Sequence, residues 1–150
     1  MTKPNKKVLI IKTSSLGDVI HTLPALTDCA KKLPGTSFDW LVEESYSEIA
    51  GWHPLVDKVI PVTIRRWRKT PLRSLFSDSW KTFRRILAIE QYDAVIDAQG
   101  LFKSAMLAPM ANGHRYGFDK YSAREPFASR FYQTKIAVDK NQHAVERTRQ

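Results

Sequence analysis

Short apolar runs alternate with helix-like apolar periods along the chain. The run Val8-Leu-Ile-Ile11 is continuous, as in a strand that is buried on both faces of a parallel sheet. After it, apolar residues recur every three or four positions from Ile20 to Ala30, which predicts one apolar face of a helix. The same criteria predict strands over 8–11, 38–42, 58–62, 92–96 and 115–118, and helices over 19–33, 44–52, 80–89 and 101–111.

This alternation predicts an α/β fold, a Rossmann-like doubly wound parallel sheet with right-handed crossovers. In such a sheet, ligands bind in the crevice beyond the carboxyl ends of the strands. Polar segments follow predicted strands at that edge, over 13–18, 65–73 and 97–104. Their convergence is the main evidence in the sequence for a functional site.

The first of these segments reads Thr13-Ser-Ser-Leu-Gly-Asp18. Gly17 stands alone and no Gly-Lys-Ser/Thr follows, so neither a dinucleotide fingerprint nor a P-loop is present. Asp18 falls at the start of the predicted helix, where the macrodipole and free backbone N–H groups favour a carboxylate. Asp18 is therefore either a helix cap or, since three hydroxyl side chains precede it, a carboxylate free for acid–base chemistry.

The second segment, Ile64-Arg-Arg-Trp-Arg-Lys-Thr-Pro-Leu-Arg73, places five cations around Trp67. Neighbouring guanidinium groups suit bidentate contact with phosphate or carboxylate. Cations with an interleaved aromatic side chain also suit a nucleic-acid backbone with a stacked base, and Trp67 would suit a membrane interface. A solvated basic loop is the plain structural alternative.

The third segment, Asp97-Ala-Gln-Gly-Leu-Phe-Lys-Ser104, turns at Gly100 into the next predicted helix. Gln99 and Lys103 are candidates to point polar groups into the crevice. Asp97 is either part of the site or the anchor of the turn.

Composition narrows the class of partner. The 150 residues carry a formal net charge of +9, so nucleic acid, a phosphorylated metabolite and an acidic membrane surface are the natural partners. Cys29 is the only cysteine, which excludes an intrachain disulfide and an all-thiolate metal site and agrees with a reducing cytoplasm. The apolar run at 8–11 is too short for a signal peptide or a membrane span. We therefore expect a cytoplasmic chain that touches a membrane only at its surface.

Long ordered motifs lie along the whole chain: Val8-Leu-Ile-Ile-Lys-Thr-Ser-Ser-Leu-Gly-Asp-Val-Ile-His-Thr-Leu-Pro-Ala-Leu26, Phe38-Asp-Trp-Leu-Val-Glu-Glu44, Val59-Ile-Pro61, Ile64-Arg-Arg-Trp-Arg-Lys69, Tyr92-Asp-Ala-Val-Ile-Asp-Ala-Gln-Gly-Leu101, Ala123-Arg-Glu-Pro126 and Gln142-His-Ala-Val-Glu-Arg147. Together these motifs resemble the lipopolysaccharide heptosyltransferase I family. The resemblance covers nearly the whole chain.

The resemblance implies an inverting glycosyltransferase of GT-B fold that transfers heptose from ADP-heptose to Kdo-lipid A at the cytoplasmic face of the inner membrane. It gives Asp18 the role of the base that takes the proton of the acceptor hydroxyl. It also implies that Arg65, Arg66, Arg68, Lys69 and Arg124 bind the acceptor. From the crevice segments we add Thr13, Ser14, Ser15, Gln99 and Lys103 as predicted acceptor-binding residues. It implies no cofactor and no metal, and His21 and His53 lack metal-ligand spacing.

The resemblance also sets an expectation about domains. A GT-B enzyme has two Rossmann-like domains, and the second holds most of the nucleotide-sugar. We expect residues 1–150 to form the N-terminal acceptor-binding domain, with the donor-binding domain absent from this chain. The rival interpretation is a stand-alone phosphate- or nucleic-acid-binding α/β module, whereas the first interpretation expects no nucleic acid.

Overall fold

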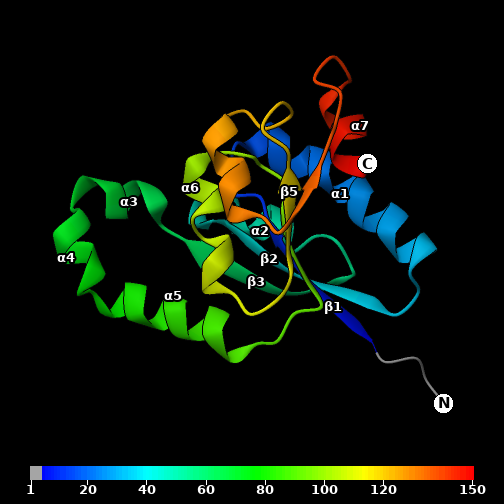
Figure 1. Cartoon of the computed structure of the whole chain (residues 1–150). Helices are drawn as coiled ribbons and strands as arrows, with labels where there is room; N and C mark the ends of the chain where they lie inside the picture. The colour runs from blue at the N-terminus through cyan, green and yellow to red at the C-terminus, as the bar shows by residue number, and fades with distance from the viewer. Residues whose placement is uncertain (1–4) are drawn as a thin grey trace.

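The computed structural model describes residues 5–150 and contains a six-stranded sheet in the order β3-β2-β1-β4-β5-β6. The strands are β1 (Lys6–Ile11), β2 (Thr36–Glu43), β3 (Val56–Val62), β4 (Ala94–Asp97), β5 (Arg115–Phe118) and β6 (Thr134–Ile136). Every pairing between them is parallel. The chain starts at β1 in the middle, builds one arm and then returns to build the other, so the strand order reverses between β1 and β4 (Figure 1).

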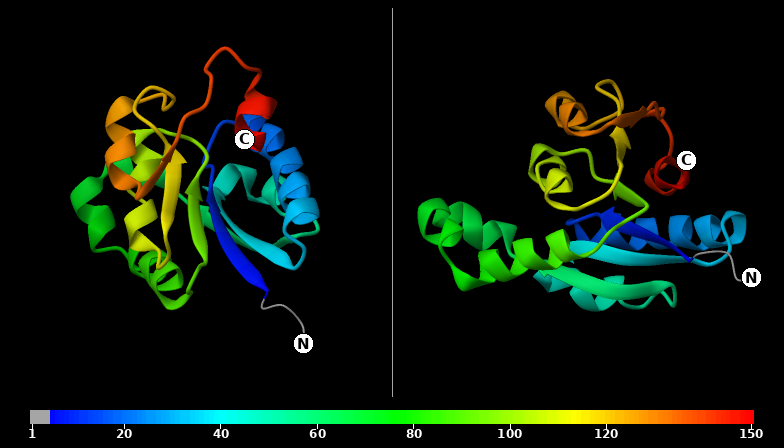
Figure 2. Two further views of the ribbon diagram at one scale, coloured as in Figure 1. Left: turned by 45° about the vertical axis from the view of Figure 1, so that its right-hand side comes forward. Right: turned by 60° about the horizontal axis from the view of Figure 1, so that its bottom comes forward.

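Helices cover both faces of this sheet (Figure 2). They are α1 (Leu16–Lys32), α2 (Ser47–Ala50), α3 (Ile64–Lys69), α4 (Pro71–Leu75), α5 (Asp78–Ile89), α6 (Phe102–Ala105) and α7 (Ala144–Arg149), with 3₁₀ turns η1 (Glu44–Tyr46), η2 (Ala108–Met110) and η3 (Pro126–Phe131). α1 and α2 lie on one face, α5 and η2 pack on the other, and α7 lies against α1. Within residues 5–150, no helix is long and apolar enough to cross a membrane.

The burial of β1 on both faces of the sheet explains its continuous apolar run. Val8 and Ile10 belong to the core beneath α1 and α2, whereas Leu9 and Ile11 belong to the core beneath α5. Because successive side chains of a strand point to opposite faces, only a strand covered on both sides needs such a run. The predicted fold class, a Rossmann-like doubly wound parallel sheet of the GT-B type, is confirmed.

Several predicted boundaries were wrong. The first helix begins at Leu16 and not at 19, so Asp18 lies inside its first turn. The single helix predicted over 101–111 is the short α6 followed by turns and η2, where Pro109 removes a backbone donor. The helix predicted over 44–52 is η1 followed by the short α2.

The basic segment predicted as a loop is two short helices, α3 and α4, separated by Thr70. Helical structure is favoured here because Ile64 and Trp67, three residues apart, both turn toward the core beneath α5. Pro71 takes the first position of α4, where its missing N–H costs nothing. The cations of this segment therefore project from helices that are anchored by apolar side chains.

Candidate functional site

Asp18 lies at the amino end of α1, directly beyond the carboxyl end of β1. The backbone N–H of Ser15 donates to Asp18 Oδ2 at 3.0 Å, and the Ser15 hydroxyl donates to the same oxygen at 3.1 Å. This is the reciprocal contact of a capping box, in which the third residue of the helix reaches back to the N-cap. The capping role considered for Asp18 is real, but it occupies only one carboxylate oxygen.

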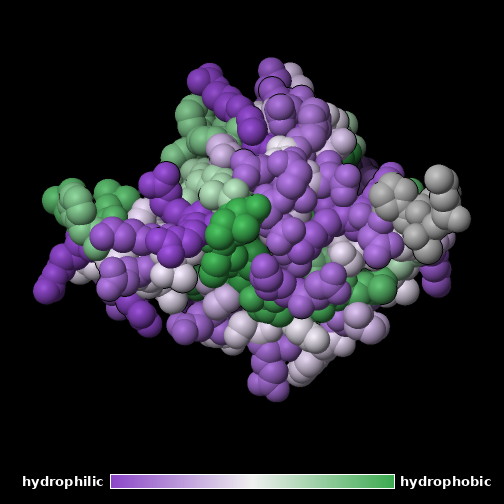
Figure 3. Space-filling model, turned by 90° about the horizontal axis from the view of Figure 1, so that it is seen from below, coloured by the Kyte–Doolittle hydropathy of each residue, from purple (hydrophilic) through white to green (hydrophobic). Residues whose placement is uncertain are grey.

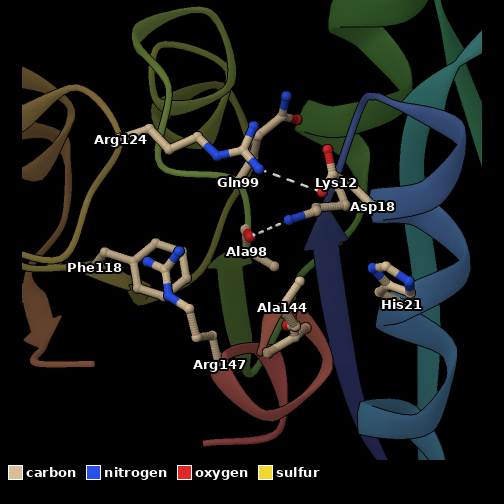
Figure 4. A pocket seen from close by; sticks show the side chains of 10 residues that line it. Lys12, Asp18, His21, Ala98, Gln99, Phe118, Arg124, Ala144 and Arg147 are labelled. Atoms are coloured by element: carbon tan, nitrogen blue, oxygen red, sulfur yellow. Dashed lines mark hydrogen bonds and ion pairs between the residues drawn. The ribbon is translucent and has the colours of Figure 1, made fainter. Parts of the chain in front are cut away.

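The other oxygen faces cations. Arg124 reaches from the loop after β5 and brings its guanidinium to 3.4 Å from Asp18 Oδ1 (Figure 4). Partial burial raises the pKa of Asp18, but the hydrogen bonds from Ser15 and the charges of Lys12 and Arg124 outweigh it, so the pKa lies below its usual value. Asp18 is therefore ionised at neutral pH, as a proton acceptor must be.

A small polar cavity of about 30 Å³ opens beside this carboxylate. Lys12 lines it from the end of β1 and donates from its ammonium to the Ala98 carbonyl at 2.7 Å (Figure 4). Burial is the main reason that the pKa of Lys12 lies below its usual value, with the charge of Arg124 adding to the effect. Positive charge thus surrounds Asp18 on the side that faces the cavity.

Arg147, on α7, also lines this cavity and was not predicted as a site residue. Its guanidinium donates to the Ser122 carbonyl at 2.9 Å and lies 5.6 Å from the centre of the Phe118 ring. Its place depends on α7 packing against α1, which no local sequence pattern specifies. The only signal in the sequence is that Arg147 ends one of the family-like motifs.

Thr13 and Gln99 lie below the surface and hold the two crevice segments together. Gln99 Oε1 accepts from the Thr13 N–H at 2.8 Å and from the Thr13 hydroxyl at 2.6 Å, and both residues are buried. The Gln99 amide nitrogen lies 3.4 Å from the hydroxyl of Ser14, to which it donates. These hydrogen bonds position the segment in front of Asp18.

Lys103, on α6, completes this network at the surface. Its ammonium donates to the Ser14 hydroxyl at 2.9 Å. Burial lowers the pKa of Lys103, and the nearby positive charges of Arg65 and Arg68 lower it further. The structure thus brings cations of α3 and of α6 to the same side of the crevice.

Asp97 anchors the turn after β4. Its carboxylate accepts from the Gln99 N–H at 2.9 Å, from the Gly100 N–H at 3.3 Å and from the Ser104 hydroxyl at 2.9 Å. The Tyr132 hydroxyl donates to it as well. Asp97 is buried beneath the crevice, so the anchoring role considered from the sequence is the one observed.

The cations of α3 and α4 are exposed. Arg66 lies 3.7 Å from Glu44, and among residues 5–150 no carboxylate pairs with Arg65, Arg68 or Lys69. In the same part of the chain, no group of three His, Cys, Asp or Glu side chains could hold a metal ion. His53 instead meets Thr27, with Nε2 2.9 Å from the hydroxyl.

Comparison with known proteins supports the resemblance. The model of glycosyltransferase family 9 (heptosyltransferase) matches residues 80–150. The chain is 56% identical over 145 residues to lipopolysaccharide heptosyltransferase 1 of Escherichia coli K12, covering 96% of this chain and 46% of that protein. It is 57% identical to the protein of that name from Pseudomonas aeruginosa, covering 96% of this chain and 41% of the relative. The chain spans about half the length of the curated relatives it matches.

Solved structures agree with the sequence relatives. The E. coli heptosyltransferase WaaC with ADP superposes with a TM-score of 0.86 at 56% identity, covering 95% of this chain and 44% of that one. A glycosyl transferase family 9 protein of Veillonella parvula, at 20% identity and a TM-score of 0.77, shows the same fold. The resemblance to the lipopolysaccharide heptosyltransferase I family is confirmed: nearly the whole of this chain is similar, in sequence and in fold, to a segment that makes up about half the length of those enzymes.

Proposed function

We propose that this chain is the acceptor-binding half of an inverting heptosyltransferase, which transfers heptose from ADP-heptose to Kdo-lipid A. The observation that carries the proposal is the ionised carboxylate of Asp18, which lies at the carboxyl edge of a doubly wound sheet next to the positive charges of Lys12 and Arg124. The relatives named above give the reaction class, and the E. coli enzyme has been solved with ADP and with ADP-2-deoxy-2-fluoro heptose.

The reaction needs one base on this half. In a single displacement, the acceptor hydroxyl oxygen forms a bond to the anomeric carbon of heptose while the bond from that carbon to the phosphate oxygen of ADP breaks. Asp18 Oδ1 takes the proton of the attacking hydroxyl. Oδ2 stays on the Ser15 N–H, which fixes the direction in which Oδ1 points.

The remaining residues have distinct tasks in this proposal. Arg124 binds a carboxylate of the acceptor beside Asp18, and Ser14, Ser15 and Lys103 line its approach. Thr13 and Gln99 act from beneath, by holding the segment in place. Arg65, Arg66, Arg68 and Lys69 bind phosphate and acidic sugar groups further out. No cofactor or metal takes part.

We place the chain in the cytoplasm, in peripheral contact with the anionic surface of the inner membrane. Leu72 and Phe76 support this proposal, since they are 75% and 77% exposed next to the cations of α3 and α4. Exposed apolar side chains beside Lys and Arg are typical of segments that lie in the interface of an anionic bilayer. Arg73, on α4 between Leu72 and Phe76, would meet the lipid phosphates.

A transfer assay tests the proposal. We expect no product when the 150-residue chain is mixed with ADP-heptose and Kdo-lipid A, because nothing then holds the donor in line. Losing that positioning forfeits up to about 7–11 kcal/mol. Fusion to the remaining half of a full-length relative should restore product, followed by mass spectrometry with the intact relative as positive control.

Two outcomes would count against this assignment. Product made by the chain alone, and lost in Asp18→Asn, would mean that the donor also binds within these residues. Displacement of the chain's bound partner by an oligonucleotide, but not by a lipid A-type glycolipid, would favour a nucleic-acid-binding module.

A further inference from the structure

An apolar groove of about 590 Å³ lies next to the polar crevice. It runs between α3 and α4 on one side and α6 with the turn after it on the other. Its apolar lining includes Trp67, Leu75, Trp80, Phe102, Met106 and Leu107. Its volume is in the range of about 300–1,000 Å³ that is typical of sites for small molecules.

The groove keeps large apolar side chains in contact with water. Leu75, Phe102 and Met106 are 52%, 44% and 45% exposed, although each lines the groove. Figure 3 shows hydrophobic residues beside strongly hydrophilic ones at the end of the molecule where α4 lies in Figure 1. Grouped apolar exposure of this kind favours a partner with an apolar surface.

The charges at the rim specify the chemistry of that partner. Arg68 and Lys103 both line the groove, so an anion can lie at its edge. The carboxylate of Glu125 also lines it, but this carboxylate already accepts a hydrogen bond from the Phe102 N–H. An apolar interior with a cationic rim is complementary to an amphiphile that has an anionic head.

The groove is continuous with the site described above. Lys103 lines the groove and also donates to Ser14 in the crevice. Two adjacent residues also connect them: Arg124 contacts Asp18 in the crevice, and Glu125 accepts from the Phe102 N–H in the groove. One ligand can therefore have its polar head in the crevice and an apolar tail in the groove.

We propose that this groove binds one acyl chain of the phosphorylated glycolipid acceptor, with an anionic group of the head on Arg68 and Lys103. The inference rests on the proposed function for its ligand. A single flexible chain fits a concave groove, whereas the surface of a bilayer cannot enter one. Leu72 and Phe76 do not line the groove and remain available to the membrane.

A chain-length series tests the groove without enzyme activity. The 150-residue chain would be titrated with n-dodecyl phosphate, n-butyl phosphate and dodecyltrimethylammonium, all below their micelle concentrations. Fluorescence of Trp67 and Trp80 reports binding because both line the groove. We expect n-dodecyl phosphate to bind at least about tenfold more tightly than n-butyl phosphate and the cationic amphiphile to bind more weakly than n-dodecyl phosphate.

Matched variants locate the effect. Met106→Asp and, independently, Leu75→Asp should remove the preference for the longer chain. Ile89→Asp is the control, since Ile89 is 75% exposed and lies outside the groove, and it should keep the preference. Circular dichroism would verify that each variant is folded.

Three results would overturn the inference: equal binding of both phosphates, equal binding of the cationic amphiphile, or a chain-length preference that survives in both groove variants. A dimer that forms through this groove without any amphiphile, seen by sedimentation, would also overturn it. The proposed function fails by a different result, namely no heptose transfer by the completed parent enzyme to a deacylated acceptor.

Discussion

The segment after β1 and the helices after β3 lie at the same edge of the sheet, but they are built in opposite ways. Around Asp18, the side chains of Thr13 and Gln99 are buried and joined by hydrogen bonds of 2.6 and 2.8 Å that involve the same oxygen. On α3, Arg65 and Arg68 are exposed, and the ion pair of this helix, Arg66 with Glu44, is 3.7 Å long between exposed side chains. The side chains around Asp18 are held by hydrogen bonds before any ligand binds, whereas the cations of α3 are not.

This difference agrees with the two different chemical tasks proposed above. A base that must meet a hydroxyl at one oxygen gains from groups that are already oriented, since reorientation would add to the barrier. A surface that attracts a large anionic head gains from reach and charge, and its side chains become ordered only on binding. We therefore expect substitutions in the first region to change turnover and stability, and substitutions in the second to change affinity and its salt dependence.

The largest expected effect tests the fixed region. In the enzyme completed with its second half, Asp18→Asn should lower kcat by about 10²–10⁴-fold, because the attacking hydroxyl loses its base. Acceptor affinity should change little, as measured by titration calorimetry. Near-normal turnover would leave Asp18 with its capping role alone.

Substitutions of the cations of α3 should change the affinity for the glycolipid. Arg65→Ala with Arg68→Ala should weaken glycolipid binding by about tenfold or more, since charge-assisted hydrogen bonds are lost. Added salt should weaken binding of the parent chain and have less effect on the double variant. The control, Arg84→Ala with Arg85→Ala, removes the same charge from the exposed face of α5. Equal losses of glycolipid affinity in both double variants would mean that net charge causes the effect, and not direct contact with Arg65 and Arg68.

The free energy of unfolding should depend on the segment around Asp18 and little on the cations of α3. Gln99→Leu leaves the buried Thr13 N–H and hydroxyl without their acceptor, which should cost about 1–3 kcal/mol in the free energy of unfolding. Arg65→Ala should stay within about 0.5 kcal/mol of the parent chain. Urea unfolding followed by circular dichroism measures both values, and similar values would contradict the distinction drawn here.

The smallest effect concerns pH. Because the pKa of Asp18 is lowered in the folded chain, its contribution to stability is present above the pKa of an unfolded Asp, about 3.9, and is lost as the pH falls through the folded pKa. The difference in unfolding free energy between the parent chain and Asp18→Asn should therefore shrink as the pH is lowered from 6 toward about 3. A difference that stays constant over this range would mean that the carboxylate gains nothing from Ser15, Lys12 and Arg124.

Much of this organisation could be predicted from the sequence because the central strands carry continuous apolar runs. The convergence of the segments at 13–18, 65–73 and 97–104 was predicted because each follows a strand at the carboxyl edge of a parallel sheet. The structure adds that the strand order reverses between β1 and β4, which brings 13–18 and 97–104 side by side. β6 could not be predicted, since Thr134, Lys135 and Ile136 form no buried run. α7 could not be predicted either, because it is a six-residue polar helix that depends on packing against α1.

The acceptor-binding roles of the site residues stay predictions. The sequence could name Gln99 as a crevice residue but not show that its side chain is buried, because burial depends on where the neighbouring strand ends. Arg147 was missed for a similar reason, since its position beside Phe118 is tertiary. Local patterns indicate strands and helices, whereas the partners of a polar side chain depend on the whole sheet.

The hydrogen bonds of the crevice also have a consequence for folding. Thr13 with Gln99, Lys12 with Ala98 and Ser14 with Lys103 are separated by 86, 86 and 89 residues along the chain. Contacts this distant form only after a long loop has closed, which is a slow and entropically costly event. A nascent chain in which β1 has not yet met β4 therefore has no such crevice, and the segment before Asp18 is not yet held in place.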